Sequence, residues 1–188
     1  MAFKGASLAR LERLGEQGHL DVFYGDECGV SLLPCVPYGW QFTDETVSSP
    51  SHRGKGINCF ALITCDNRCF FRLSERAIDA DLVCDYLDQF SRQLVRETVV
   101  VLDNAPVHQA ELKKRRAGWE ARGLSVFFLP VYSPHLNRAE ILWKKLKYEW
   151  LVAEDYAERS LLCYRVWQCL ASVGRELTIG FKPFQSNN

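Results

Sequence analysis

The sequence predicts an α/β fold built on a mixed five-stranded sheet with helices on both faces. Three β-prone runs, at 20–26, 57–65 and 68–73, follow one another without an intervening helix, which favours an antiparallel meander. Over 97–151 strand and helix patterns alternate, as is typical of parallel βαβ units. Of the 188 residues, 47% are hydrophobic and 24% charged, so one large domain with a substantial core is expected.

The N-terminal half supplies the meander. Leu8, Leu11 and Leu14 recur every three residues and predict a short amphipathic helix. The pair Asp66-Asn67 separates two apolar runs and indicates a hairpin turn. The expected elements are a helix over 6–16, a strand over 20–26 that ends in an acid, an extended segment over 28–43 with an irregular lead-in, a loop over 47–56, and strands over 57–65 and 68–73.

The C-terminal half alternates strands and helices. The run 97–102 is apolar and too short for a helix, so it predicts a buried, parallel strand. Pro106 suits the first turn of the next helix, and Gly123 ends that helix. The expected elements are helices over 78–94, 106–121, 136–151 and 157–176, and strands over 97–102 and 124–129.

Charge and composition exclude several classes of protein. Basic and acidic residues both number 23, a balance that argues weakly against a nucleic-acid-binding protein. Basic clusters at 113–116 and 144–147 soften that objection, although either is also explained as a solvated helix face. No apolar run approaches the roughly 18 residues of a membrane helix, and no secretory signal is visible. The eight cysteines form no CxxC pair, so we expect buried free thiols in a reducing cytoplasm.

Three acids stand at the ends or starts of predicted elements. Asp26 ends the first strand, Asp103 ends the strand 97–102, and Glu140 lies on the helix after Pro134. Strands whose carboxyl ends are adjacent present their terminal residues to one crevice. Two carboxylates there repel each other unless a cation lies between them. The pattern therefore predicts a site for a pair of divalent cations, which is what in-line displacement at a phosphodiester needs.

Glu140 lies beside an apolar stripe on its predicted helix. Ala139, Leu142, Trp143, Leu146 and Trp150 form that stripe. Glu140 lies one position off it, on a flank shared with Asn137, Lys144 and Lys147. We expect this flank to face the edge of the sheet, where the two lysines could contact an anionic backbone.

Each acid also has a plain structural explanation. Asp26 could be a turn residue, Glu140 a solvated helix residue, and Asp103 a helix cap. After Asp103, Asn104 could orient that acid or only cap the helix, and His108 could approach a phosphate or only be a polar first-turn residue. The joint placement of the three acids is more specific evidence for a cation site than any one acid alone.

Three blocks carry a resemblance to a known family. They are Gly25-Asp26-Glu27-Cys28-Gly29, Leu102-Asp103-Asn104-Ala105-Pro106-Val107-His108, and the block from Ser133 to Lys147 that contains Asn137 and Glu140. Together they resemble the signature blocks of the DDE transposases, mariner superfamily, bacterial insertion sequence 630 group. The 36 residues of 104–139 separate the second and third acids, close to the spacing of that family. The resemblance covers about 20–148.

This resemblance implies an RNase H-like fold and two Mg²⁺ or Mn²⁺ ions held by Asp26, Asp103 and Glu140. It also implies cleavage of DNA at transposon ends and transfer into a TA target by a homodimer, in the cytoplasm at the nucleoid. The expected division is an N-terminal helix or linker over 1–18, a catalytic domain over 19–152, and a C-terminal helix and tail over 153–188 that packs on the same domain.

The chain departs from the family pattern in two places. Arg138-Ala139 stands where Pro-Ile is usual, which affects the expected entry into the helix. The helix-turn-helix region that precedes the catalytic domain in the family is expected as a separately encoded product, unless the chain is a shortened or decayed copy. Two alternative functions are an RNase H-like nuclease that cuts RNA–DNA hybrids or junctions, and an inactive remnant.

Other residues are weaker candidates for nucleic-acid contacts. Arg53 and Lys55, in a Gly-rich loop, could contact phosphate or belong to a plain loop. Trp40 and Trp143 are expected as core aromatics, with stacking on a flipped base as the alternative.

Overall fold

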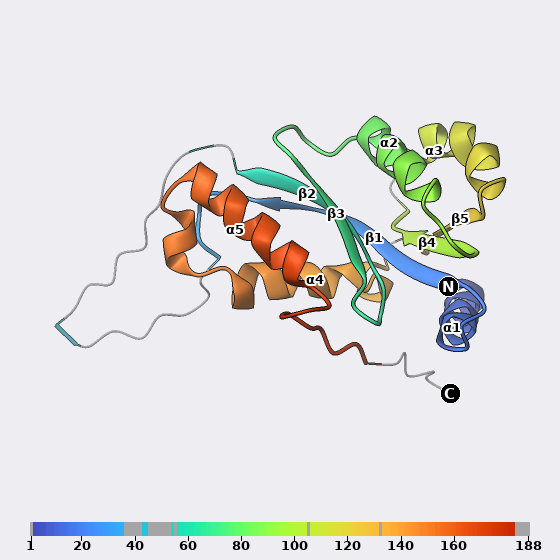
Figure 1. Ribbon diagram of the computed structural model, residues 1–188, viewed down its shortest axis with the longest axis horizontal. Helices are drawn as coiled ribbons and strands as arrows, with labels where there is room; N and C mark the ends of the chain where they lie inside the picture. The colour runs from blue at the N-terminus through green and yellow to red at the C-terminus, as the bar shows by residue number, and fades with distance from the viewer. Residues whose placement is uncertain are drawn as a thin grey trace.

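A mixed five-stranded sheet forms the centre of the protein (Figure 1). The computed structural model describes residues 2–35, 43–44, 54, 56–104, 106–131 and 133–182, with the side chains of 2–6 and 106–110 outside the description. The principal elements are α1 (Ala2–Glu16), β1 (Asp21–Val30), β2 (Ile57–Ile63), β3 (Cys69–Ser74), α2 (Ala80–Ser91), β4 (Thr98–Leu102), α3 (Pro106–Glu120), β5 (Leu124–Phe128), α4 (Ala139–Lys145) and α5 (Arg159–Ser172).

The strand order is β3-β2-β1-β4-β5. β1, β2 and β3 pair antiparallel, whereas β1–β4 and β4–β5 pair parallel. The hairpin between β2 and β3 turns at Asn67, whose φ of 67° is one that asparagine tolerates well. The predicted meander, hairpin and parallel section are therefore confirmed.

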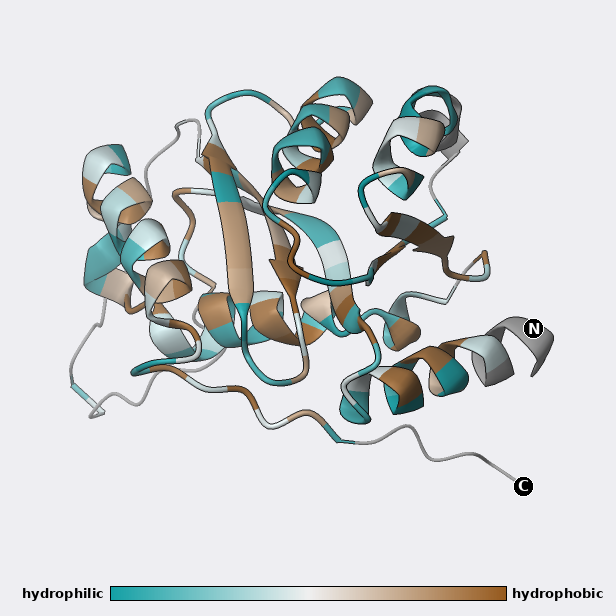
Figure 2. Ribbon diagram, turned by 45° about the vertical axis from the view of Figure 1, so that its right-hand side comes forward, coloured by the Kyte–Doolittle hydropathy of each residue, from teal (hydrophilic) through white to brown (hydrophobic). Residues whose placement is uncertain are grey.

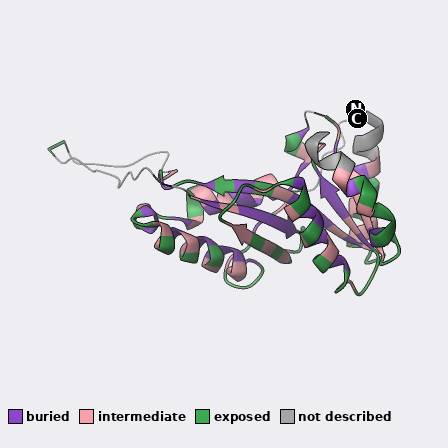
Figure 3. Cartoon of the chain, turned by 90° about the horizontal axis from the view of Figure 1, so that it is seen from above, coloured by how far each residue is buried: buried purple, intermediate pink, exposed green. Residues whose placement is uncertain are grey.

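Helices cover both faces of the sheet. α4 and α5 contact β1, β2 and β3 on one face, and α2 packs with α3 on the other. The strands are mostly hydrophobic (Figure 2). The inner strands β1, β2 and β4 are mostly buried, whereas the edge strands β3 and β5 are mostly half-buried (Figure 3). Successive side chains of a strand point to opposite faces of the sheet, so they pack in two separate hydrophobic cores, one on each face.

The register assigns residues of β1 to these two faces. Tyr24, Asp26 and Cys28 lie opposite Ile63, Ala61 and Cys59, and those three partners belong to the core under α4 and α5. Glu27 lies opposite Phe60, which belongs to the core under α2 and α3. Asp26 and Glu27 therefore point to opposite faces of the sheet.

The first strand is longer than predicted, so the expectation that Asp26 ends it is wrong. β1 continues to Val30 because its pairing with β2 continues to Val30–Ile57 and because Cys28 and Val30 are buried. The extended segment expected over 28–43 thus begins inside β1. Residues 36–42 and 45–53 lie outside the described residues, as does most of the expected loop over 47–56.

The helix expected over 136–151 is divided. A 3-10 turn at Pro134–Leu136 precedes α4, and a π-helical turn at Leu146–Trp150 follows it. Asn137 separates the first turn from α4 with an extended backbone (φ −85°, ψ 111°). The last helix is shorter than predicted, with a 3-10 turn at Ala153–Tyr156 before α5.

The structure bears on two expectations from composition, one about membrane-spanning helices and one about the cysteines. No helix among the described residues is long and apolar enough to cross a bilayer. All eight cysteines are free, but only four are buried, and Cys65 is exposed. The expectation of buried thiols is therefore confirmed only in part.

Candidate active site

Asp26 lies where β1 extends beyond its parallel neighbour. The last pair of β1 with β4 is Tyr24 with Val101, and Asp26 and Asp103 each follow by two residues. The two acids therefore lie at corresponding positions past the last β1–β4 pair, Asp26 within β1 and Asp103 directly after β4. Gly25 permits this close packing, since a Cβ there would lie 2.6 Å from Leu102 Cδ2.

Asn137 fixes the start of α4 against β1. It is 3% exposed, and its Nδ2 donates to the carbonyl oxygen of Gly25 at 3.0 Å. Its Oδ1 accepts from the backbone N–H of Ala139 at 3.1 Å, which satisfies one of the unpaired donors at the helix start. Asn137 thus joins α4 to the residue that precedes Asp26.

Trp143 also contacts this part of β1. Its indole Nε1 donates to Oδ2 of Asp26 at 3.1 Å, while the side chain is only 4% exposed. Its prediction as a core aromatic is confirmed, but the hydrogen bond to Asp26 was not anticipated. The pattern Glu140-x-x-Trp143 could have suggested it, because residues three apart on a helix are neighbours.

Glu140 is partly exposed in the first turn of α4, between Asn137 and Trp143. The apolar stripe predicted beside it is present, with Ala139, Leu142, Trp143 and Leu146 buried. Glu140 therefore faces the edge of the core, as its position beside the stripe predicted.

The electrostatics of Asp26 show that the acids are neighbours. The pKa of Asp26 is raised to about 7, first by burial and then by the charges of Glu140, Glu27 and Asp103, while a backbone hydrogen bond with Glu27 opposes the rise. Asp103 is exposed directly after β4 and also borders a small cavity with Glu27 on the α2 side. Asp103 is thus the acid that is least closely grouped with the other two.

The donor set fits hard divalent cations. Carboxylate oxygens are the ligands that Mg²⁺ prefers, and a cation would relieve the repulsion that raises the pKa of Asp26. Within the described part of the chain, no three Asp, Glu, His or Cys side chains lie close enough together to hold a metal ion. The three acids share one region without reaching coordination distance, and their assignment as ligands stays a prediction.

The basic side chains of the two predicted clusters differ in exposure and in pairing with acids. Lys144 is exposed, and Lys147 is half-buried beside Cys28. Lys147 also lines a cavity of about 610 Å³ beside the end of β1 at Gly29 and Val30, together with Glu75 and Arg76. In the cluster 113–116, by contrast, Arg115 binds Asp85 and Asp88 of α2, so that cluster is partly neutralised.

Several candidate residues cannot be placed. Trp40, Arg53 and Lys55 lie outside the described residues, and so does the side chain of His108. Asn104 is half-buried immediately after Asp103, and its role stays a prediction.

Arg138 enters α4 where the family pattern has proline. Its φ of −64° is one that proline would also adopt, so the entry into the helix is the one that the pattern requires. The side chain is buried, and its Nε donates to Oε1 of Glu12 at 3.3 Å. Glu12 also accepts from the hydroxyl of Tyr24, so α1, β1 and the start of α4 are joined.

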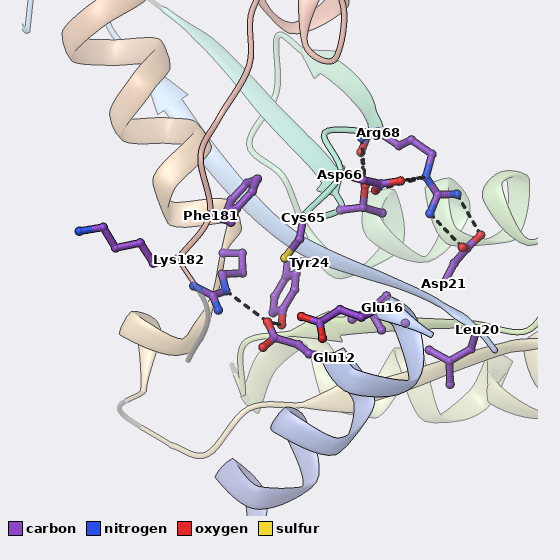
Figure 4. A pocket seen from close by; sticks show the side chains of 14 residues that line it. Glu12, Glu16, Leu20, Asp21, Tyr24, Cys65, Asp66, Arg68, Phe181 and Lys182 are labelled. Carbon is purple, nitrogen blue, oxygen red and sulfur yellow. Dashed lines mark hydrogen bonds and ion pairs between the residues drawn. The ribbon is translucent and has the colours of Figure 1, made fainter. Parts of the chain in front are cut away.

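These residues border a cavity of about 320 Å³ beside the first half of β1 (Figure 4). Its charges are largely paired internally, as in the two contacts of 2.9 and 3.0 Å between Arg68 and Asp21. Asp26, Asp103 and Glu140 do not line it, so it is separate from the candidate site.

This chain is similar to a known protein family and to a protein of an insertion element. Residues 21–163 match the family described as DDE superfamily endonuclease. The insertion element IS630 uncharacterized 39 kDa protein of Shigella sonnei is 26% identical over 168 residues, covering 81% of this chain and 43% of that protein.

Two solved structures of Mos1 transposase complexes are similar. The paired-end complex with the left transposon end has a TM-score of 0.51 at 18% identity, covering 92% of this chain and 60% of that chain. The strand transfer complex has a TM-score of 0.50 at 18% identity, covering 90% and 58%. The chain spans less than two thirds of these proteins, and the likeness confirms the predicted RNase H-like fold.

The family match includes β1, β4 and α4, the elements that carry Asp26, Asp103 and Glu140 to one region of the sheet. On that match, the chain belongs to the DDE superfamily endonucleases.

Proposed function

We propose that this chain is the catalytic part of a transposase that cuts DNA at the ends of an insertion element and joins them to target DNA. The observation that carries the proposal is geometric: Asp26 and Asp103 each follow the last β1–β4 pair by two residues, and Asn137 ties the start of α4, which carries Glu140, to the residue before Asp26. The family match and the insertion-element relative support the same activity.

The proposed roles follow from the positions of the acids. Asp26 and Asp103, at corresponding positions past the last β1–β4 pair, hold divalent cations together with Glu140. When bound, Mg²⁺ or Mn²⁺ ions offset the negative charge that develops on phosphate oxygens during displacement. One Mos1 complex of the same fold is described with Mn, at a TM-score of 0.50. Trp143 and Asn137 hold Asp26 and α4 in place.

Cleavage and joining are two displacements at phosphorus. In the first, water attacks the phosphodiester at the element end and a 3′-hydroxyl leaves. In the second, that hydroxyl attacks a target phosphodiester and displaces a second 3′-oxygen. The carboxylates act by binding and orientation in both steps.

The test is Mn²⁺-dependent nicking of element-end DNA by the wild type and by Asp103→Asn and Glu140→Gln. Both variants should lose activity by at least about 100-fold, the scale expected for removing one group that stabilises a transition state electrostatically. Glu120→Gln is the control, because this exposed acid of α3 pairs with Arg116 and is not among the groups that act on Asp26. Activity that survives either of the first two changes contradicts the assignment. Cleavage confined to RNA–DNA hybrids or junctions favours the nuclease alternative, and no cleavage of any substrate favours an inactive remnant.

DNA is proposed to run from Asp26 toward the cavity at the end of β1, beside Gly29 and Val30. Lys147 and Arg76 line it, and Lys144 lies exposed on α4. Each lysine that contacts a phosphate should contribute about one unit to the slope of log affinity against log salt. Lys147→Ala should lower that slope, whereas Lys113→Ala, an exposed lysine of α3, should not.

The homodimer and the separately encoded helix-turn-helix partner stay predictions. Because end recognition is assigned to that partner, this chain alone should bind DNA weakly and without sequence preference. Tight, sequence-specific binding by the chain alone would contradict this assignment.

A further inference from the structure

Two hydrogen bonds join the α4 segment to consecutive residues of β1. Asn137 donates to the Gly25 carbonyl, and Trp143 donates to the Asp26 carboxylate. Glu140 lies midway between these two donors along the chain. The segment is thus held to β1 on both sides of Glu140, and a shift of Glu140 relative to Asp26 would break at least one of these bonds.

We propose that Trp143 is a positioning residue that fixes the Asp26 carboxylate for cation binding. This inference rests on the proposed function. An ionised carboxylate has about four acceptor positions. The indole N–H takes one of them on Oδ2, which leaves Oδ1 and one lone pair of Oδ2 for cations.

The indole is itself buried. Trp143 is 4% exposed and packs in the core under α4 and α5, where Leu142 and Leu146 are fully buried. Tryptophan combines this apolar contact with a single N–H donor, a combination that phenylalanine lacks. Groups that hydrogen-bond the ligands of metal sites typically contribute 10- to 100-fold to metal affinity.

The chain contains a matched control. Trp119 of α3 is 1% exposed, and its Nε1 donates to Oδ1 of Asp88 at 2.7 Å. Changing either tryptophan to phenylalanine removes one buried indole that bonds an aspartate. Only Trp143 bonds Asp26, so the two variants separate a positioning role from a general loss of packing.

The first experiment measures Mn²⁺ affinity by calorimetry and thermal unfolding in parallel. Trp143→Phe should weaken Mn²⁺ binding by at least about 10-fold. Trp119→Phe should leave the affinity unchanged even where it lowers the unfolding temperature, and Asp26→Asn should abolish binding. Wild-type affinity in folded Trp143→Phe overturns the positioning role.

A second experiment needs no folded variant at position 143. In ¹H–¹⁵N spectra of the wild type, Mn²⁺ at a small fraction of the protein concentration should broaden the Trp143 indole signal before that of Trp119. Equal broadening of both signals overturns the positioning role but leaves the proposed function standing, provided that Asp26→Asn still weakens binding. Mn²⁺ binding that Asp26→Asn does not weaken overturns both.

Discussion

Asn137→Ala should destabilise the protein more than most single substitutions. The change leaves the Gly25 carbonyl and the Ala139 N–H without their partners in a region where Asn137 is 3% exposed. An unsatisfied buried polar group costs about 1–3 kcal/mol, so the two together should cost roughly 2–4 kcal/mol after partial rescue by water. For a chain of this size that is a fall of roughly 5–12 °C in unfolding temperature.

Urea and thermal unfolding measure this loss, and Mn²⁺ affinity reports on the site. The control is Asn67→Gly, since Asn67 makes the same kind of pair, with the carbonyl and N–H of Ile179 at 3.1 and 2.7 Å, at the β2–β3 turn. Glycine also adopts the positive φ found there. Asn137→Ala should weaken Mn²⁺ binding and Asn67→Gly should not. A loss below about 0.5 kcal/mol, the usual scale of surface substitutions, would refute the reasoning.

Three further predictions concern the same region. The pKa of Asp26 is about 7 in the folded state against 3.8 for a free side chain, so its stabilising contribution is complete below pH 3.8 and is lost as the pH rises through 7. Asp26→Asn should therefore raise the free energy of unfolding at pH 8 by up to about 4 kcal/mol and hardly change it at pH 3.5. Thermal unfolding at both pH values measures this difference. Gly25→Ala should cost about 1–3 kcal/mol in urea unfolding, because its Cβ would meet Leu102 at 2.6 Å, and a neutral effect would contradict that contact. Arg138→Ala should cost up to about 3 kcal/mol, because it removes the guanidinium beside the half-buried Glu12 carboxylate. The double change Glu12→Gln/Arg138→Met should cost less, and equal losses in urea unfolding would argue against the pair.

Periodicity and turn residues predicted most of the sheet. The apolar run 97–102 became β4, and Asp66-Asn67 lies in the β2–β3 turn. The predicted end of β1 at Asp26 was wrong, since an acid in a strand resembles a terminus when its neighbours are unknown. Pairing with β2 carries β1 on to Val30, and no local pattern encodes that pairing.

The candidate site shows the same limit. The acids were identified from spacing and resemblance, and the flank position of Glu140 from helical periodicity. The hydrogen bond from Trp143 to Asp26 joins residues 117 positions apart, so it depends on how α4 packs on β1. The contact of Glu12 with Arg138 spans 126 positions and is likewise a product of tertiary packing.

The junction of Glu12, Tyr24 and Arg138 bears on how the protein can be shortened for experiments. A fragment that starts at residue 19 would delete Glu12, whose carboxylate accepts from the buried guanidinium of Arg138 two positions before Glu140. Poor yield or misfolding of such a fragment would then reflect an electrostatic defect beside the third acid rather than the loss of a dispensable leader. Fragments designed for crystallisation or assay should therefore retain the first helix.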